Sequence, residues 1–322
     1  MNRRTLLAAG GTLALPLPAL AQPAWPRRPI VLVIPSAAGG ATDTVGRIIA
    51  QKLTESLGVS VVAENRPGAG GSIATEYGAF VPPDGHILTL GQLGTLAVNQ
   101  HLFRVRFDPL RDFVPVALVA QVPSILVVNP KMGTRTVQEF VAYAKANPGK
   151  VNYGSAGAGS ATHIIMAAFQ EAAGIELTHV PYRGSGPVMT DLVAGNIDCA
   201  ITGTPAGAPF ARAGTLWALV ATSPQRLALL PDVPTVAETI QPGFEGMQWF
   251  GIIAPARTPP EIVTRLNQAV NEAVVTQEVR QRLADEGADP DPRTPEAFRA
   301  LIAAEIERWG ALVRRQNIRA DG

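Results

Sequence analysis

Short apolar runs alternate along the chain with segments whose apolar residues recur every three or four positions. Residues 30–34 form a continuous apolar run typical of a buried strand, and apolar positions in 45–57 then repeat at helical spacing until Gly58. Further strands are predicted at 59–63, 87–90, 115–120, 124–128, 151–153, 177–180, 197–201, 216–221 and 249–253. Helices are predicted at about 160–173 and 187–194, and after Pro259 and Pro295. This alternation predicts an α/β protein with largely parallel sheets.

The first 21 residues have the pattern of an export signal. A basic start at Arg3 and Arg4 precedes a mostly apolar stretch, and Ala19-Leu20-Ala21 fits a cleavage site, so we expect cleavage after Ala21. Prolines interrupt the stretch, which is also too short for a membrane anchor. The arginine pair fits both a twin-arginine and an ordinary secretory signal. We therefore expect an exported protein that is soluble once the signal is removed.

The remaining length, about 300 residues, is more than one hydrophobic core usually serves. The apolar stretches 113–128 and 249–253 lie where the chain would pass between two lobes. Prolines at 115 and 123 interrupt the first stretch, which favours two strands in succession. We expect residues 22–121 and 250–322 to form lobe 1 and residues 122–249 to form lobe 2, after a signal peptide at 1–21. The absence of a Gly/Ser linker favours a tight hinge.

Composition excludes several classes of function. Acidic and basic residues nearly balance, which argues against nucleic acid or an anionic membrane surface as partner. Cys199 is the only cysteine, so no internal disulfide or cysteine-based metal cluster can form. The four histidines lack the spacing of a zinc site: His86, His101, His163 and His179. No dinucleotide, Walker or nucleophile-elbow motif is complete, and we expect no cofactor, no metal and no catalytic residue.

Three turns rich in glycine and small hydroxyl residues precede apolar helical patterns: Ser36–Thr42, Gly154–Ser160 and Gly184–Pro187. Each turn would direct backbone N–H groups out of a helix N-terminus. These groups, together with the helix dipole, can hold an anion such as a carboxylate without a cationic side chain. Three such helix ends in one chain predict a shared small-molecule site.

Six motifs, in order, resemble those of the Bug or TctC family of periplasmic solute receptors, which are associated with tripartite tricarboxylate transporters. The motifs are Pro35–Asp43, Glu64–Gly71, Pro83–Gly85, Asn152–His163, His179–Gly184 and Leu230–Thr235. The resemblance implies a periplasmic location and a two-lobed, type II-like periplasmic binding-protein fold. Each lobe would be a mostly parallel sheet flanked by helices, with two hinge strands. A small organic acid, a mono- or dicarboxylate, would bind in the cleft as the lobes close.

The residues expected to contact the ligand come from both walls of the cleft. From lobe 1 they are Ser36, Ala37, Gly39, Gly40, Ala41, Thr42, Asp43 and Thr95; from lobe 2 they are Ser155, Gly157, Gly159, Ser160, His163, Tyr182, Arg183, Gly184 and Thr202. Several of them have an equally good structural interpretation. Asp43 can cap its helix, a neutral His163 can form a structural hydrogen bond, Arg183 can lie on the surface, and the hydroxyls can cap turns.

The sequence departs from the family pattern at two places. Thr202-Gly203 stands where the family often has Phe-Asp, and Ala167 stands where it usually has Glu. Both changes remove a carboxylate, which favours a plain mono- or dicarboxylic acid over an amino acid.

Two other functions stay open at this point, a secreted hydrolase and a ligand-sensing subunit without transport. Ser160 and His163 fall on one helical turn, whereas a hydrolase serine normally has a distant histidine with its own acid partner. The expected partners are the organic acid and the membrane subunits of a tripartite transporter or a sensor kinase. A monomer is expected because a receptor must close freely.

Overall fold

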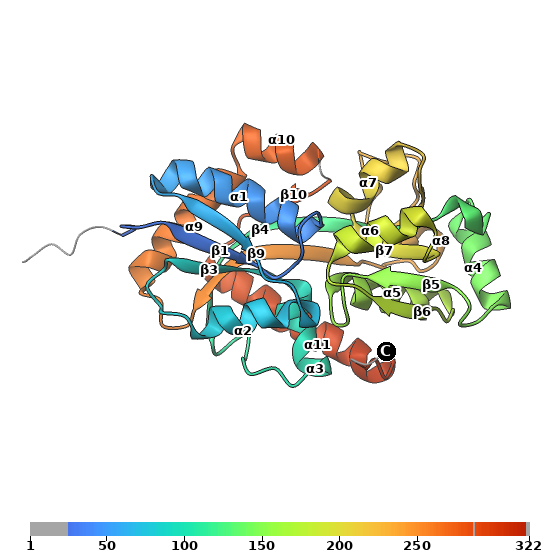
Figure 1. Cartoon of the computed structure of the whole chain (residues 1–322), viewed down its shortest axis with the longest axis horizontal. Coiled ribbons are helices and arrows are strands. Elements are labelled where there is room, and N and C mark those ends of the chain that lie inside the picture. Colours follow the sequence, from blue (N-terminus) through green and yellow to red (C-terminus); the bar gives the residue numbers. More distant parts are fainter. Residues whose placement is uncertain (1–24, 286, 320–322) are drawn as a thin grey trace, which may run out of the picture.

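The computed structural model describes residues 25–285 and 287–319, so the predicted signal at 1–21 lies outside the described residues. Figure 1 shows two halves side by side, joined by long strands that run through the middle of the molecule. Within the described residues, ten strands form one continuous sheet in the order β2-β1-β3-β9-β4-β7-β5-β6, with β8 and β10 paired to β4. The α/β fold predicted from the alternation is confirmed.

The first half contains three parallel strands and the helices that cover them. The strands are β1 (Ile30–Ile34), β2 (Val61–Asn65) and β3 (Ile87–Gln92). The other elements of this half are α1 (Ala41–Leu57), η1 (Ala69–Gly71), α2 (Ser72–Phe80), η2 (Gly94–Val98), α3 (Asn99–Leu102), α9 (Pro260–Val274), α10 (Gln277–Asp285), β10 (Asp289–Pro290) and α11 (Pro295–Arg315).

The second half repeats this arrangement around β5 (Asn152–Ser155), which lies parallel to β6 (Thr178–Pro181) and β7 (Cys199–Gly203). Its other elements are η3 (Pro130–Met132), α4 (Val137–Ala146), α5 (Ala161–Ala173), α6 (Ser185–Ala194), α7 (Thr204–Arg212), β8 (Trp217–Ala221) and α8 (Val236–Thr239). Glycines in the left-handed conformation end α1, α5 and α6, as predicted: Gly58, Gly174 and Gly195.

The two halves are connected by β4 (Phe113–Val128) and β9 (Met247–Pro255), which pair antiparallel. Every pairing that involves β4 or β9 is antiparallel, so the sheet is mixed, with its parallel pairs on the outside. The prediction of two separate strands in 113–128 was wrong. β4 stays continuous because both prolines lie at irregular points of its pairing. Its register with β9 shifts after Pro115, and after Pro123 it begins to pair with β7, from Ser124 onwards. Proline lacks the N–H of a regular ladder and fits at such irregularities.

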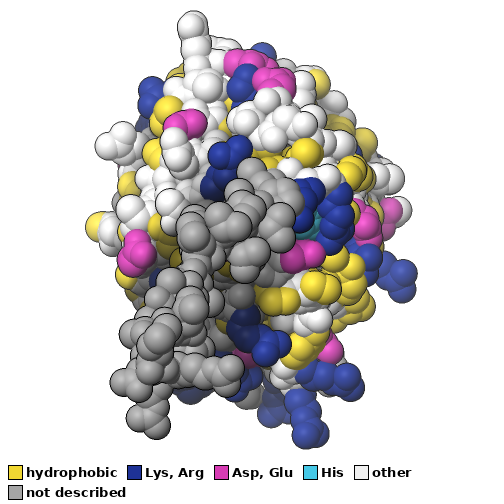
Figure 2. All heavy atoms as spheres, turned by 90° about the vertical axis from the view of Figure 1, so that its left-hand side faces the viewer, with side chains coloured by type: hydrophobic (Ala, Val, Ile, Leu, Met, Phe, Trp, Pro, Cys, Tyr) yellow, Lys and Arg dark blue, Asp and Glu magenta, His cyan; other side chains and the backbone are white. Residues whose placement is uncertain are grey.

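The interior is apolar on both sides of the sheet. One core lies under α1 and α9 and includes Leu53, Phe250 and Leu266, all fully buried. A second core links the halves, since Trp309 and Phe298 of α11 pack in one cluster with Phe169 of α5. Figure 2 shows basic, acidic and apolar side chains mixed over the end of the first half, in keeping with the near-zero net charge. No helix in the described part of the chain is long and apolar enough to cross a membrane.

Candidate ligand-binding site

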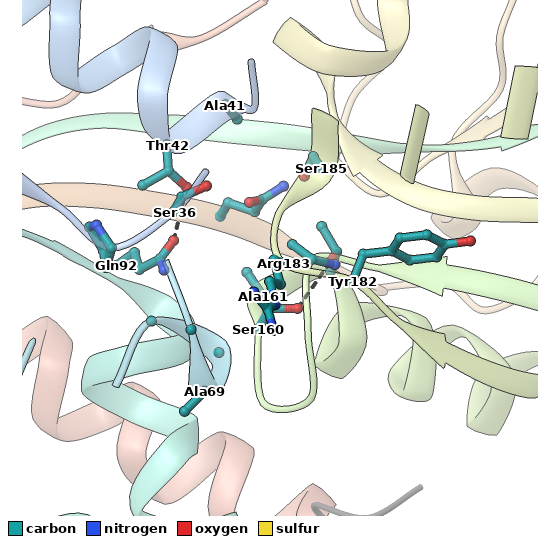
Figure 3. A pocket seen from close by; sticks show the side chains of 17 residues that line it. Ser36, Ala41, Thr42, Ala69, Gln92, Ser160, Ala161, Tyr182, Arg183 and Ser185 are labelled. Carbon is teal, nitrogen blue, oxygen red and sulfur yellow. Dashed lines mark hydrogen bonds between the residues drawn. The ribbon is translucent and has the colours of Figure 1, made fainter. Parts of the chain in front are cut away.

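A cavity lies between the two halves, where the N-terminal ends of α1, α5 and α6 meet (Figure 3). Its empty space, including the open mouth, is about 540 Å³. It is lined by Pro35, Ser36, Ala41, Thr42, Gly68, Ala69, Gly70, Gly71, Gln92, Ala156, Ser160, Ala161, Thr162, Tyr182, Arg183, Ser185 and Gln248. All three predicted turns contribute to this lining.

The helix ends at the cavity differ in how their first amide groups are satisfied. The residues that cap α1 and α6 are Gly40 and Gly184, and neither has a side chain that can accept a hydrogen bond from the first turn. At α5, Ser160 Oγ accepts a hydrogen bond from the backbone N–H of His163 (3.3 Å). The N-termini of α1 and α6 therefore present free N–H donors and the positive ends of their dipoles to an anion.

Glycines allow the two halves to approach closely around the cavity. A Cβ added at Gly186, on α6, would lie 2.8 Å from the carbonyl oxygen of Ala38 in the turn before α1. A Cβ added at Gly94 would lie 2.7 Å from the carbonyl oxygen of Gly159. Side chains at these positions would hold the halves apart, so this close approach depends on glycine.

The cavity lining is polar but almost entirely uncharged. Thr42 Oγ1 donates a hydrogen bond to Gln92 Oε1 (3.0 Å), and Gln248 Nε2 donates one to Ser124 Oγ (2.8 Å). Arg183 is the only charged side chain among the lining residues and is exposed at the mouth. Such a lining can stabilise one or two negative charges through dipoles and a single cation, and it has no carboxylate that would repel an acid.

Tyr182 contributes to the lining, but its hydroxyl is bonded elsewhere. Its Oη donates a hydrogen bond to Asp191 Oδ2 (2.7 Å), and Figure 3 shows the ring extending away from the cavity. Burial, followed by the hydrogen bond to Asp191, raises the pKa of Tyr182 to about 12. Tyr182 therefore stays protonated and shapes the wall of the cavity.

Asp43 was predicted to contact the ligand, but it lies behind the cavity. Its carboxylate accepts hydrogen bonds from the Gly39 amide (3.1 Å), Arg47 Nε (2.9 Å) and Asn65 Nδ2 (2.8 Å). Burial alone would raise the pKa of Asp43, but these three hydrogen bonds outweigh burial and lower it. The carboxylate is thus fully engaged in fixing the turn before α1, a structural role, although it does not cap the N–H groups of the helix itself.

Ser155 and His163 lie beneath the second wall rather than in it. His163 Nδ1 accepts a hydrogen bond from the Gly159 amide (3.1 Å), and its ring stacks on that of His179 with centroids 4.1 Å apart. Burial, with a smaller contribution from His179, lowers the pKa of His163 to about 3. Burial lowers the pKa of His179 to about 4. Both rings are therefore neutral supports for the 156–160 turn at neutral pH.

The contact between Ser155 Oγ and His179 Nε2 (2.6 Å) has the spacing of a nucleophile and its base. Ser155 is only 1% exposed, however, and does not line the cavity. Among the described residues, His179 Nδ1 has no hydrogen-bond partner, so no carboxylate orients this ring. Ser155 Oγ instead accepts a hydrogen bond from the Gly157 amide (3.1 Å). The pair therefore supports the turn.

The remaining predicted residues lie beside the cavity or in the interior. Thr95 donates to the carbonyl oxygen of Gln92 (3.2 Å), and Thr202 is buried in β7. The others form the contact between the halves, or shape the turns that make it: Ala37, Gly39, Gly40, Gly157, Gly159 and Gly184. They fall outside the lining because they bring the backbone of one half against the other, which leaves no space for a ligand there.

Sequence reasoning missed the segment Gly68–Gly71 and the side chains of Gln92, Ser185 and Gln248, all of which line the cavity. Gly68–Gly71 belongs to a motif that carried the resemblance, and its glycines were a usable signal. Ser185 lay inside the third predicted turn. Gln92 lies at the end of one apolar strand and Gln248 near the start of another. A single glutamine at the end of a strand does not indicate a binding site.

A larger hollow of about 990 Å³, including its mouth, lies near Pro123 and Met247. Its lining is dominated by a loop that includes Leu227 and Leu229, and its cation, Arg226, is paired with Glu238 (3.0 Å). The smaller cavity is the better candidate because helix N-termini converge on it. Among the described residues, no group of three histidine, cysteine or acidic side chains could hold a metal ion.

Comparison with known proteins agrees with this geometry. The model of the tripartite tricarboxylate transporter family receptor, TctC, matches residues 45–318. This chain belongs to that family. Protein BugT of Bordetella pertussis is 38% identical to it over 320 residues, 98% of each chain. The resemblance found in the motifs is confirmed.

Solved structures of similar proteins establish the two-lobed fold of this TctC family member. MatC from Rhodopseudomonas palustris, with bound malate, has a TM-score of 0.86 and 36% identity and covers 90% of this chain and 100% of its own. R. palustris Rpa4515, with adipate, has a TM-score of 0.89 and 37% identity and covers 92% of this chain and 99% of its own. The protein is thus a solute-binding receptor of the two-lobed periplasmic type, as the motifs implied.

Proposed function

We propose that this receptor captures a small mono- or dicarboxylic acid in the cavity between its halves and does not convert it. The observation that carries the proposal is the convergence of the α1 and α6 N-termini, both without a capping side chain, on a cavity whose single charged side chain is Arg183. Two structurally similar relatives that hold malate and adipate support the same class of ligand.

The proposed mechanism is closure of two lobes around the acid. We place lobe 1 at 22–121 and 250–322 and lobe 2 at 122–249, because β4 and β9 run through both halves and can flex between them. Only the closed form brings donors from α1 and from α6 onto one ligand. The ligand thus binds the closed form more tightly and increases its population.

The proposed cellular role is delivery in the periplasm, after cleavage following Ala21, of the bound acid to the membrane subunits of a tripartite transporter. The family description supports a transporter as partner. A monomer suits this role because both lobes must move freely. Purification of the native protein with membrane subunits would support transport, whereas purification with the outer domain of a sensor kinase would favour a sensing role.

A thermal-shift screen of organic acids, followed by calorimetric titration, tests the proposal. An acid at a concentration 100 times its Kd should stabilise the protein by about 2.7 kcal/mol. The bound acid should be recovered unchanged after prolonged incubation, as judged by NMR of the solution. Failure of every mono- and dicarboxylic acid to bind would refute the ligand class, and steady formation of a product would refute the receptor role.

A further inference from the structure

Two glutamine side chains line the cavity from neighbouring strands near the boundary between the halves. Gln92 ends β3 and Gln248 is near the start of β9. In the antiparallel pairing of these strands Gln92 lies opposite Phe250, so Gln248, two residues away, is on the same face of the sheet. Diagonal neighbours of this kind have backbones roughly 7–8 Å apart, a spacing that a small acid can bridge.

Each glutamine is held at one end of its carboxamide group. Gln92 Oε1 accepts the hydrogen bond of Thr42, which Figure 3 shows beside it, and Gln248 Nε2 donates to the buried hydroxyl of Ser124. The two residues are only 7% and 4% exposed, and the hydrogen bonds to Thr42 and Ser124 set the orientation of their carboxamide groups in the structure. Gln92 therefore directs its N–H donors, and Gln248 its carbonyl oxygen, toward the cavity.

The atoms directed toward the cavity have no partner in the protein. Within residues 25–285 and 287–319, no group accepts a hydrogen bond from Gln92 Nε2 and none donates one to Gln248 Oε1. Neither atom is among the fully buried polar atoms that lack a partner, so both are in contact with the cavity space. The pair thus offers one neutral donor and one neutral acceptor side by side.

Gly203 makes room for the Gln248 carboxamide. A Cβ at Gly203 would lie 2.9 Å from Gln248 Nε2 and 2.9 Å from the Cβ of Ala41. The backbone at Gly203 has φ −62°, which any residue can adopt. Glycine is therefore needed at this position for lack of space and not for its backbone conformation. The carboxamide of Gln248, on β9, therefore occupies the space that a side chain at position 203 of β7 would need.

We propose that Gln92 and Gln248 determine the specificity of the site for acids that carry a hydroxyl group. Gln92 Nε2 donates a hydrogen bond to an oxygen of the acid, and Gln248 Oε1 accepts one from its hydroxyl. A carboxylate oxygen cannot donate to Gln248, so among the groups of the acid a hydroxyl can satisfy this acceptor directly and a carboxylate cannot. This inference rests on the proposed function and narrows its ligand class to hydroxy acids.

The test compares acids that differ only by one hydroxyl: malate with succinate, lactate with propionate, and other 2-hydroxy acids of three to six carbons with their parent acids. Calorimetric titration of the wild-type protein should give at least about fivefold tighter binding of the hydroxy acid in any pair that binds. Equal affinity within a binding pair would overturn this inference and leave the proposed function intact. Failure of every acid to bind would overturn both.

Variants assign the preference to the two glutamines. Gln248→Met keeps the length of the side chain and removes the acceptor, so the preference for the hydroxy acid should fall to within about twofold. Gln92→Met removes the donor and should weaken both acids of a pair. Gly203→Ala displaces the Gln248 amide without removing it and should also reduce the preference. Gln268→Met, on the exposed face of α9, is the matched control and should change nothing.

Melting temperatures of all four variants show which of them fold. The wild-type comparison needs no variant, so it decides the ligand class even if loss of the Ser124 hydrogen bond unfolds Gln248→Met. A full hydroxy-acid preference in folded Gln248→Met and folded Gly203→Ala would overturn the assignment to Gln248. An unchanged affinity in folded Gln92→Met would overturn the role of Gln92 as donor.

Discussion

Closure of the receptor should depend on the absence of a single methyl group at Gly186. This residue lies in the first turn of α6 and has a helical conformation that alanine adopts readily. An alanine Cβ would lie 2.8 Å from the carbonyl oxygen of Ala38, closer than such atoms normally approach. The contact crosses from one half to the other, so it exists only when the halves are closed.

The expected magnitude follows from two opposing effects. Overpacking of a close contact costs about 1–3 kcal/mol, which corresponds to binding that is about 5- to 150-fold weaker in Gly186→Ala. In the open form the methyl group meets no obstacle from the other half. Alanine has a higher helix propensity than glycine and lowers the conformational entropy of the unfolded chain. The free energy of unfolding of the open form should therefore stay unchanged or rise by up to about 1 kcal/mol.

Calorimetry with the best acid from the thermal-shift screen, together with melting of the ligand-free protein, measures both effects. Gly186→Val should bind more weakly still, because its side chain is larger. Thr190→Ala, at an exposed position of the same helix, raises helix propensity without adding bulk between the halves and serves as the control. Wild-type affinity in Gly186→Ala would refute the reasoning, because it would mean that the acid binds without the contact between Gly186 and Ala38.

Three further outcomes are expected. Asp43→Asn should lower stability by about 2 kcal/mol in denaturant unfolding, because it weakens charge-assisted hydrogen bonds, while acid affinity stays within about threefold; a complete loss of binding in the folded variant would place Asp43 in the site. Arg183→Ala should weaken a dicarboxylate by less than about fivefold in calorimetry, since Arg183 is exposed; a hundredfold loss would show that this cation dominates. The native pKa values of His163 and His179, about 3 and about 4, lie below the ordinary value of 6.5. The unfolded chain therefore binds protons first, and the melting temperature should fall as the pH drops from about 6.5 to 4. A double substitution of both histidines by glutamine should flatten this slope, and an unchanged slope in the folded double variant would contradict it.

Local sequence patterns were sufficient to predict the α/β order of elements, the glycine ends of α1, α5 and α6, and the three turns at the cavity. These features depend on local patterns: the period of apolar residues, glycine in left-handed conformations, and small residues before a helix. The motifs determined the family for the same reason, since each is a short contiguous segment. A structural role for Asp43 was also within reach, because its place in the first turn of α1 allowed one.

Which residues of those turns face the cavity depends on the packing of the two halves, and these patterns did not predict it. Gly70 and Gly157 have the same chemistry and approach each other across the boundary between the halves, but Gly70 also lines the cavity and Gly157 does not. The placement of Gln92 beside Gln248, more than 150 residues apart in the chain, follows from the antiparallel pairing of β3 with β9. Local sequence fixes the direction of a helix end, whereas the neighbours of a side chain depend on how distant segments pack, and no short pattern encodes that packing.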